Sequence, residues 1–233
     1  MTGEEYAALQ ARLRAMADPD YRAFHQKLVP EVDNLLGVRI PALRGLAREL
    51  ARGDWRGYLA AAGTDAYEET MLQGLVLGYA RMEIGELLER LREFIPKIGN
   101  WAVNDSVCAG LKLVKKHREE TLAFLRPYFA GESEFEVRFA VVMLMDHYID
   151  ETYIDEALSL LRTVRHEGYY VKMAVAWALS VCYVKFPERT RPLLQGEAFD
   201  PQTRRMALQK IVESNRVDAR EKAEIRALRK AVR

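Results

Sequence analysis

The spacing of apolar residues is the feature that most constrains what this chain can fold into. Apolar side chains recur every three or four positions along nearly its whole length, and no stretch rich in Val, Ile and Thr alternates with period two between hairpin turns. This pattern predicts an all-α fold. The expected helices cover residues 3–17, 19–29, 41–52, 54–62, 66–81, 84–95, 102–115, 117–130, 134–149, 151–163, 168–186, 188–195, 202–215 and 218–231, with bounds good to about 2–4 residues.

The long helices also recur at a fixed distance. Segments that begin near Trp101, Glu134 and Tyr169 are spaced by about 33 to 35 residues, and a more polar helix follows each of them. This spacing is typical of HEAT-like repeats, although it is somewhat short for them. We therefore predict an α-solenoid of stacked antiparallel helix pairs with a concave face. No low-complexity linker divides the chain, so residues 1–233 are expected to form a single domain.

The composition excludes several classes of protein. With 49% apolar and 30% charged residues, the 233-residue chain can build a core and is not expected to be disordered. No run approaches 18 uncharged apolar residues, and the first residues lack the pattern of a signal peptide. Cys108 and Cys182 do not suggest a disulfide framework. These features predict a cytoplasmic protein without a membrane span.

The charge is distributed unevenly. Residues 202–233 carry 10 Lys and Arg against 4 Asp and Glu, whereas the rest of the chain has a net charge of −5. The chain therefore has a basic helical end at 202–233 on a mildly acidic body. Such an end suits a nucleic-acid partner, because basic side chains release counterions from phosphates. On charge alone, a solvated terminal helix with its own ion pairs is the favoured interpretation.

A tryptophan and an aspartate share one face of the helix expected at 102–115. Trp101 and Asp105 are four residues apart, and Cys108 and Lys112 continue the same face. The opposite stripe is apolar and is the natural core side; it consists of Val103, Val107, Gly110, Leu111 and Val114. The pair could serve a function, or it could pack against a neighbouring repeat. In the second case Asp105 would form a cap or an ion pair, and Asn100 is also placed to cap the helix.

Two further residues stand out in the most apolar helices. Arg138 lies early in a segment that is otherwise mostly apolar, where a guanidinium needs a carboxylate, phosphate or carbonyl partner. An ion pair with Glu134 or Glu136 would also satisfy it. Trp177 lies midway along the second apolar segment and, taken alone, reads as a core residue.

No other motif points to a cofactor or a metal. The four histidines lack metal-ligand spacing with each other or with the cysteines, and neither cysteine has the surroundings of a nucleophile. The glycine-rich motifs of nucleotide-binding proteins and the nucleophile motif of serine hydrolases are absent from the sequence. We therefore expect no metal and no cofactor.

Four segments resemble one known family. Residues 37–44 (GVRIPALR) and 98–106 (IGNWAVNDS) are similar to motifs of the bacterial DNA alkylation repair family, the HEAT-like-repeat alkylpurine DNA glycosylases. The segments around Arg138 (EVRFAVVMLMDHYI) and Trp177 (YYVKMAVAWALS) resemble it too, and residues 169–188 are similar to a divergent branch. The resemblance runs from about residue 20 to 210. The Trp-x-x-x-Asp motif is moderately specific, and its combination with Arg138 and Trp177 is more specific.

The resemblance implies a role for each of these residues. Asp105 corresponds to the catalytic carboxylate, Trp101 and Trp177 to aromatic walls beside the damaged nucleotide, and Arg138 to a residue that helps hold the DNA. It also implies that the concave face binds duplex DNA and that the four side chains lie within about one nucleotide of each other.

The resulting hypothesis is a DNA glycosylase that excises cationic N3- or N7-alkylated purines from duplex DNA by hydrolysing the N-glycosidic bond. We expect it to be a monomer, associated with the nucleoid when bound to DNA. Further DNA contacts are expected from the basic residues Lys112, Lys172, Arg204, Arg205, Lys210 and Arg216. The alternative is a non-catalytic solenoid that binds nucleic acid or another protein and has lost glycosylase activity.

Overall fold

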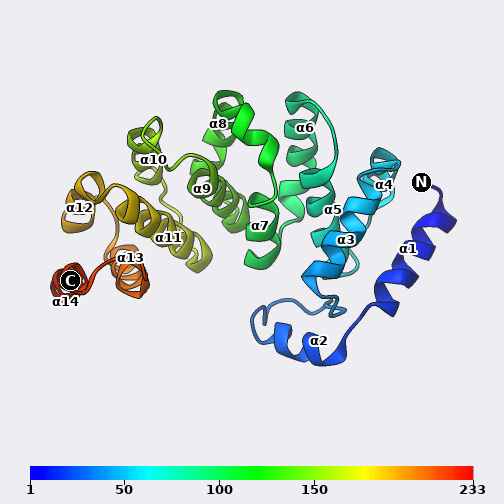
Figure 1. Ribbon diagram of the computed structural model, residues 1–233, viewed down its shortest axis with the longest axis horizontal. Helices are drawn as coiled ribbons and strands as arrows, with labels where there is room; N and C mark the ends of the chain where they lie inside the picture. Colours follow the sequence, from blue (N-terminus) through cyan, green and yellow to red (C-terminus); the bar gives the residue numbers. More distant parts are fainter. Residues whose placement is uncertain (233) are drawn as a thin grey trace. The chain divides into compact units, whose positions relative to one another are not determined.

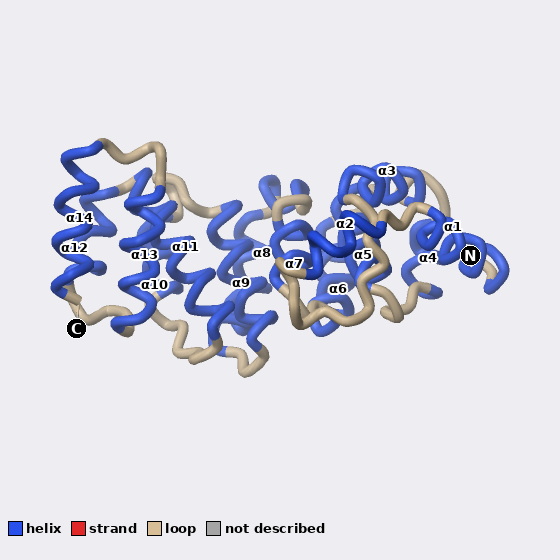
Figure 2. The backbone as a smooth tube through the Cα atoms, turned by 90° about the horizontal axis from the view of Figure 1, so that it is seen from below, coloured by secondary structure: helices blue, strands red, loops and turns tan. Residues whose placement is uncertain are grey.

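The computed structural model describes residues 1–232, and within that range its regular secondary structure is helical only (Figure 2). The all-α prediction is therefore confirmed. None of the described helices is long and apolar enough to cross a membrane. The chain divides into two compact units, an N-terminal unit, Met1–His117, and a C-terminal unit, Arg118–Arg233. The expectation of a single domain stays a prediction.

The N-terminal unit is organised around one buried helix, α5. In Figure 1 this helix follows the blue α1 to α4, and it packs against both α3 and α7. Every residue of α5 from Tyr67 to Leu77 is buried. The helices of the unit are α1 (Gly3–Ala15), α2 (Pro19–Gln26), α3 (Ile40–Leu50), α4 (Trp55–Ala61), α5 (Tyr67–Tyr79), α6 (Ile84–Phe94) and α7 (Trp101–Cys108), with short 3-10 turns at Ile95–Lys97 and Lys112–Lys116.

The C-terminal unit has a second row of packed helices. Its longest helix, α11, packs between α9 and α13, and α14 packs on α13. The apolar segments predicted at 134–149 and 168–186 form α9 and α11, and both are buried along most of their length. The helices of the unit are α8 (Arg118–Leu125), α9 (Glu134–His147), α10 (Ile154–Leu161), α11 (Tyr169–Lys185), α12 (Pro187–Gln195), α13 (Pro201–Glu213) and α14 (Ala219–Ala231), with a 3-10 turn at Arg126–Ala130.

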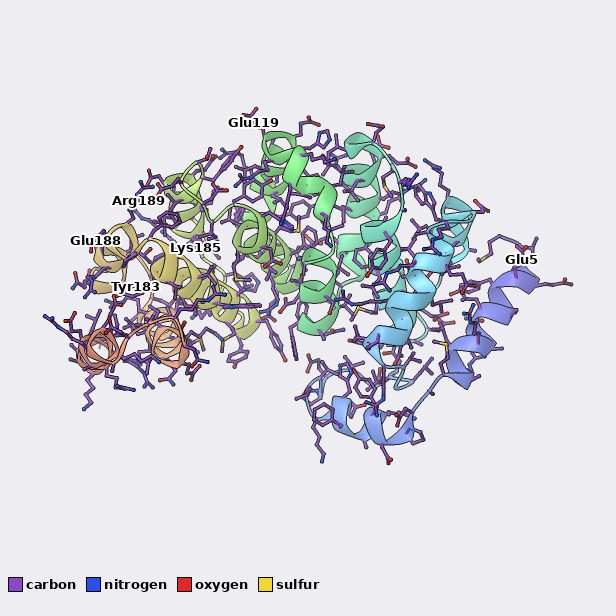
Figure 3. All side chains as sticks on the ribbon, in the orientation of Figure 1. Glu5, Glu119, Tyr183, Lys185, Glu188 and Arg189 are labelled. Atoms are coloured by element: carbon purple, nitrogen blue, oxygen red, sulfur yellow. The ribbon has the colours of Figure 1, made fainter. Side chains whose placement is uncertain are left out.

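The helices that carry the repeat start at regular distances along the chain. Helices α5, α7, α9, α11 and α13 begin at residues 67, 101, 134, 169 and 201. Hydrogen bonds between successive repeats within a unit span similar lengths of sequence. Tyr148 donates to the Arg118 carbonyl over 30 residues. Lys185, which is labelled in Figure 3, donates to the Ile149 carbonyl over 36 residues. The helix packing is consistent with an α-solenoid.

The single helix predicted at 102–115 is wrong. Helix α7 ends at Cys108, and a separate 3-10 turn follows at Lys112–Lys116. The break lies at Gly110, whose N–H donates to the Val107 carbonyl. A Cβ on Gly78 of α5 would lie 3.0 Å from the Gly110 oxygen, so the two backbones meet closely here. The predicted apolar residues Leu111 and Val114 remain buried, because the tighter turn points them to the same core.

Candidate functional site

Helix α7 presents Trp101 and Asp105 away from the core of the N-terminal unit. Both are partly exposed, whereas Val103 and Val107 are buried. The helix starts where it does because the Asn100 side chain accepts a hydrogen bond from the Val103 N–H at 2.9 Å, as an N-cap does. Asn100 therefore fills the capping role that the sequence suggested for either Asn100 or Asp105.

The rest of the predicted face does not continue from Asp105. Cys108 is fully buried, and Lys112 lies beyond the end of α7, in the 3-10 turn. Lys112 is exposed and forms no ion pair with the described residues. Cys108 follows Asp105 by three residues within α7, but its burial keeps the thiol out of reach of solvent.

The indole of Trp101 is anchored to the loop that follows α2. Its Nε1–H donates to the Leu28 carbonyl oxygen at 3.1 Å. The same loop is held further along by the Gln26 side chain, which donates to the Val29 and Val32 carbonyls. One edge of the indole is thus fixed by main-chain geometry. Nothing in the sequence of residues 19–29 signalled this contact, because the segment reads as one continuous helix.

A buried carboxylate fixes the far end of this loop. Glu68, in the first turn of α5, is fully buried and accepts hydrogen bonds from three successive backbone N–H groups, those of Leu36, Gly37 and Val38, at 2.7–3.0 Å. Gly37 has φ +97°, a conformation that L side chains rarely adopt. These amides satisfy the buried charge, so the motif at 37–44 begins from a rigid turn.

Asp105 has a neighbour that the sequence analysis did not single out. The side-chain amide of Asn104 donates from Nδ2 to Oδ1 of Asp105 at 3.1 Å, and Asn104 itself is fully buried. The carboxylate is therefore partly exposed on one side and hydrogen-bonded on the other. The consecutive letters Asn-Asp were visible in the sequence, but adjacent helix positions usually face different ways.

In the C-terminal unit Arg138 is buried and holds the start of α11. Only 4% of its surface is exposed, and its Nη1 donates to the Tyr170 carbonyl at 2.7 Å. Glu134 accepts from the Tyr170 N–H at 2.6 Å, so two residues of α9 bind one residue of α11. The sequence predicted that the Arg138 guanidinium needs a hydrogen-bond partner. The Tyr170 carbonyl is such a partner.

Trp177 lies at the surface and not in the core. It is 36% exposed on a helix that is otherwise mostly buried, and Tyr170 and Met173 on the same stripe are also partly exposed. Beside Met173 is an open hollow of about 280 Å³, which α11 shares with α13 and α14. Its lining residues are Met173, Arg205, Met206, Gln209, Lys210, Glu213 and Arg229.

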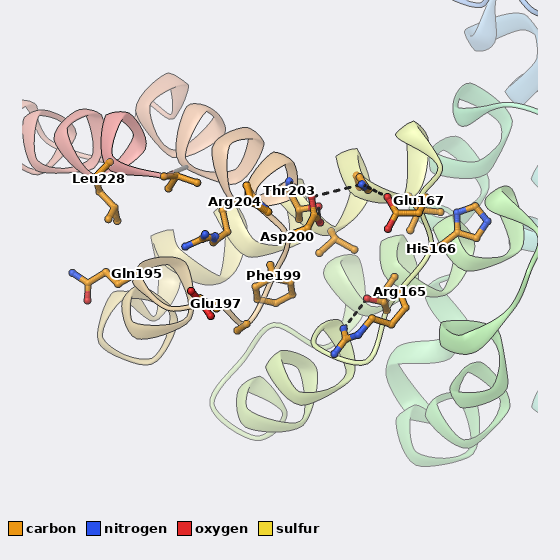
Figure 4. Close-up of a pocket in the computed structure, with 18 residues that line it drawn as sticks. Arg165, His166, Glu167, Gln195, Glu197, Phe199, Asp200, Thr203, Arg204 and Leu228 are labelled. Carbon is orange, nitrogen blue, oxygen red and sulfur yellow. Dashed lines mark hydrogen bonds and ion pairs between the residues drawn. The ribbon is translucent and has the colours of Figure 1, made fainter.

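The basic residues predicted to contact DNA therefore divide into separate groups. Arg205 and Lys210 line the hollow beside Met173, and Arg216 is exposed between α13 and α14. Lys172 and Arg204 line a different and larger hollow, of about 670 Å³, shown in Figure 4.

The cations of the larger hollow already have partners. Lys172 is buried and pairs with Glu167 at 2.6 Å and with Asp200 at 3.6 Å. Its hydrogen bond to Glu167 is the main cause that raises the pKa of Lys172. Arg204 donates to the Gly196 carbonyl at 2.6 Å. This hollow is balanced in charge, so it offers no preference for a phosphate.

The chemistry available at these positions is that of carboxylates and aromatic rings. Burial raises the pKa of the Cys182 thiol to about 12, so this cysteine stays protonated and unreactive at neutral pH. Among the described residues, no group of three or more His, Cys, Asp or Glu side chains could hold a metal ion.

The comparisons with known proteins identify one family. A family model described as DNA alkylation repair enzyme matches residues 9–211 of the 233. Trp101, Asp105, Arg138 and Trp177 all lie inside the matched range. No curated protein matches the chain.

Proposed function

The chain belongs to the DNA alkylation repair enzyme family, and we propose that it is a DNA glycosylase acting on cationic N3- and N7-alkylated purines in duplex DNA. The family gives a role in DNA alkylation repair. The observation that best supports the finer proposal is the exposed face of α7, where Asp105 presents a carboxylate one helical turn from the Trp101 indole. The proposed enzyme is a cytoplasmic monomer that needs neither metal nor cofactor.

The proposed reaction is hydrolysis of the N-glycosidic bond. The bond from C1′ to the purine breaks, the base leaves with the electron pair and becomes neutral, and positive charge builds on the deoxyribose. Water then bonds to C1′ and loses a proton. The Asp105 carboxylate would stabilise the sugar cation or orient the water, and its partly exposed position admits both reactants.

The tryptophans supply selectivity for the alkylated base. An indole face attracts cations, so contact with Trp101 or Trp177 favours a purine that alkylation has made positive over a neutral one. Trp177 is open to such contact because it is exposed on α11. The hydrogen bond to the Leu28 carbonyl fixes the orientation of the Trp101 indole. Arg138 belongs to the proposal as a DNA-holding residue.

The remaining cations are proposed to contact phosphates without reading sequence. Lys112, Arg205, Lys210 and Arg216 are the stronger candidates because each is exposed or lines the open hollow beside Met173. Lys172 and Arg204 are weaker candidates, since a phosphate would have to replace the partners they already have.

The proposal is tested by measuring base release. The protein is incubated with duplex DNA that carries 7-methylguanine or 3-methyladenine, and released base is compared with a heat-depurination control. Asp105→Asn keeps the shape of the side chain and removes its charge, so release is expected to fall about tenfold to a thousandfold. DNA binding should stay equal or tighten, because a negative charge near the phosphates is gone.

The melting temperature of the same variant separates catalysis from stability. It should hardly change, since the residues that pack α7 and the following turn into the core are Val103, Val107, Leu111 and Val114. A clear drop in melting temperature without a selective loss of release would assign Asp105 a structural role. Duplex binding with no release by the wild type would identify a non-catalytic nucleic-acid-binding protein.

A further inference from the structure

Asn104 occupies a position in α7 that packing alone does not explain. It is 0% exposed, and it lies between the partly exposed Asp105 and the apolar core of the N-terminal unit. Its Nδ2 donates to Asp105 Oδ1 at 3.1 Å and approaches Cys108 Sγ at 3.9 Å. Its own Oδ1 is buried and has no hydrogen-bond partner among residues 1–232.

Such an arrangement is costly for the fold. A buried acceptor without a partner loses its hydration and gains nothing in return, so an apolar side chain of similar shape would serve the core better. The amide orientation is also determined. An ionised carboxylate accepts hydrogen bonds only, so the amide nitrogen and not the oxygen must face Asp105. The Asn104 amide therefore donates to the Asp105 carboxylate, while its own oxygen has no hydrogen-bond partner among residues 1–232.

We propose that Asn104 is a positioning residue for Asp105, holding the carboxylate in one rotamer for the stabilisation of the sugar cation. This inference rests on the proposed glycosylase function. The amide donor comes from a side chain that cannot move away, because it is enclosed by the core. Preorganised partners of this kind cost no reorganisation when charge develops on the substrate.

The test compares Asn104→Leu with the wild type. Leu has nearly the same size and branches at the same carbon, but it cannot donate a hydrogen bond. The single-turnover rate constant of base release should fall about 10- to 100-fold, as when a partner that orients a functional group is removed. The dissociation constant for DNA should not change, and the melting temperature should stay level or rise, since the orphaned oxygen is gone. Asn104→Ala serves the same comparison if the Leu variant does not fold.

A matched control removes a different buried amide from the same unit. Gln73→Leu deletes the amide that donates to the Gly63 carbonyl at 2.7 Å and accepts from Lys97 at 2.9 Å, neither of which involves Asp105. It should lower the melting temperature and leave the rate constant of release unchanged. For Asn104→Leu we expect the opposite, a lower rate constant of release with an unchanged or higher melting temperature. This difference between the two variants would identify a positioning role.

A double-mutant cycle and a magnetic-resonance signal complete the test. In an Asp105→Asn background, Asn104→Leu should have no further effect on the rate constant, because both changes break one interaction. The Asn104 side-chain amide signal should move in Asp105→Asn and stay in place in Gln73→Leu. A fully active Asn104→Leu variant would overturn the inference alone. A wild type that releases no base would overturn the proposed function, and an Asn104 signal insensitive to Asp105→Asn would then overturn the inference as well.

Discussion

The residues expected to carry the chemistry differ in how far they reach solvent. Trp101, Asp105 and Trp177 are partly exposed, whereas Arg138 is almost entirely enclosed and bonded to the Tyr170 carbonyl. The exposure of Trp177 was the feature that its sequence context predicted least well, because an aromatic residue at helical spacing in an apolar segment usually belongs to the core. Only the resemblance assigned it to a site, and its exposure fits that assignment.

The exposure of Trp177 leads to a prediction about selectivity. Trp177→Leu should weaken the preference for a cationic purine, since a cation–π contact contributes about 0.5–2 kcal/mol, or roughly 2- to 30-fold in affinity. Folding should change little because the side chain is 36% exposed. The measurement is the ratio of dissociation constants for duplexes with 7-methylguanine and with guanine, in an Asp105→Asn background that slows excision.

Tyr169 provides the comparison for that measurement. It is a large, exposed aromatic residue on the same helix, and its truncation to Leu should leave the affinity ratio unchanged. Equal ratios for Trp177→Leu and the parent protein would remove Trp177 from the proposed site.

At the scale of single elements, the loop between α2 and α3 depends on one glycine. Gly37 has φ +97°, and a Cβ there would lie 2.6 Å from Arg22 Cβ and 2.7 Å from the Asp18 carbonyl oxygen. Gly37→Ala should therefore lower the free energy of unfolding by about 2–4 kcal/mol, through backbone strain and crowding. Urea unfolding followed by circular dichroism measures the change.

Gly45 is a matched control in the helix that follows. It lies inside α3, and an added Cβ would meet nothing within 4 Å. Gly45→Ala should raise the free energy of unfolding by about 0.5–1 kcal/mol, because alanine loses less conformational freedom in a helix. Equal effects of the two substitutions would contradict the strain and crowding expected at position 37.

The elements themselves were largely predictable, and the exceptions have identifiable causes. The segments starting near Trp101, Glu134 and Tyr169 were found because their apolar spacing is long and regular. The end of α7 was missed because Leu111 and Val114 keep the apolar spacing through a 3-10 turn. The supports of the site at Leu28 and Glu68 were missed because they act through contacts 73 and 30–32 residues apart, which no local pattern reports.

At the scale of the whole molecule, DNA binding depends on which Lys and Arg side chains are available to contact phosphates. The sequence counts a surplus of basic residues at 202–233, but the structure separates cations with partners from cations without them. Lys172, outside that segment, is enclosed with two carboxylates, whereas Lys112 and Lys210 form no ion pair with the described residues. Counting charges overstates the part of the surface that can bind phosphate.

This difference is measurable in the salt dependence of DNA binding. Lys112→Ala and Lys210→Ala should each reduce the slope of log affinity against log salt by ~0.9, the value for one lost phosphate contact. Lys172→Ala should leave the slope unchanged and lower the melting temperature, since it removes a nearly enclosed side chain together with its ion pairs to Glu167 and Asp200. A duplex titration across a range of salt concentrations gives all three slopes, and identical slopes for every variant would exclude these two lysines from the interface.

The anchoring of Trp101 to a backbone carbonyl has an evolutionary consequence. Every amino acid at position 28 presents the same carbonyl oxygen to the indole, so the bond survives any substitution that preserves the loop. The Leu28 side chain is itself exposed, and selection can alter it without disturbing the tryptophan. Position 28 is thus free to drift or to adapt while its neighbour in the site stays fixed.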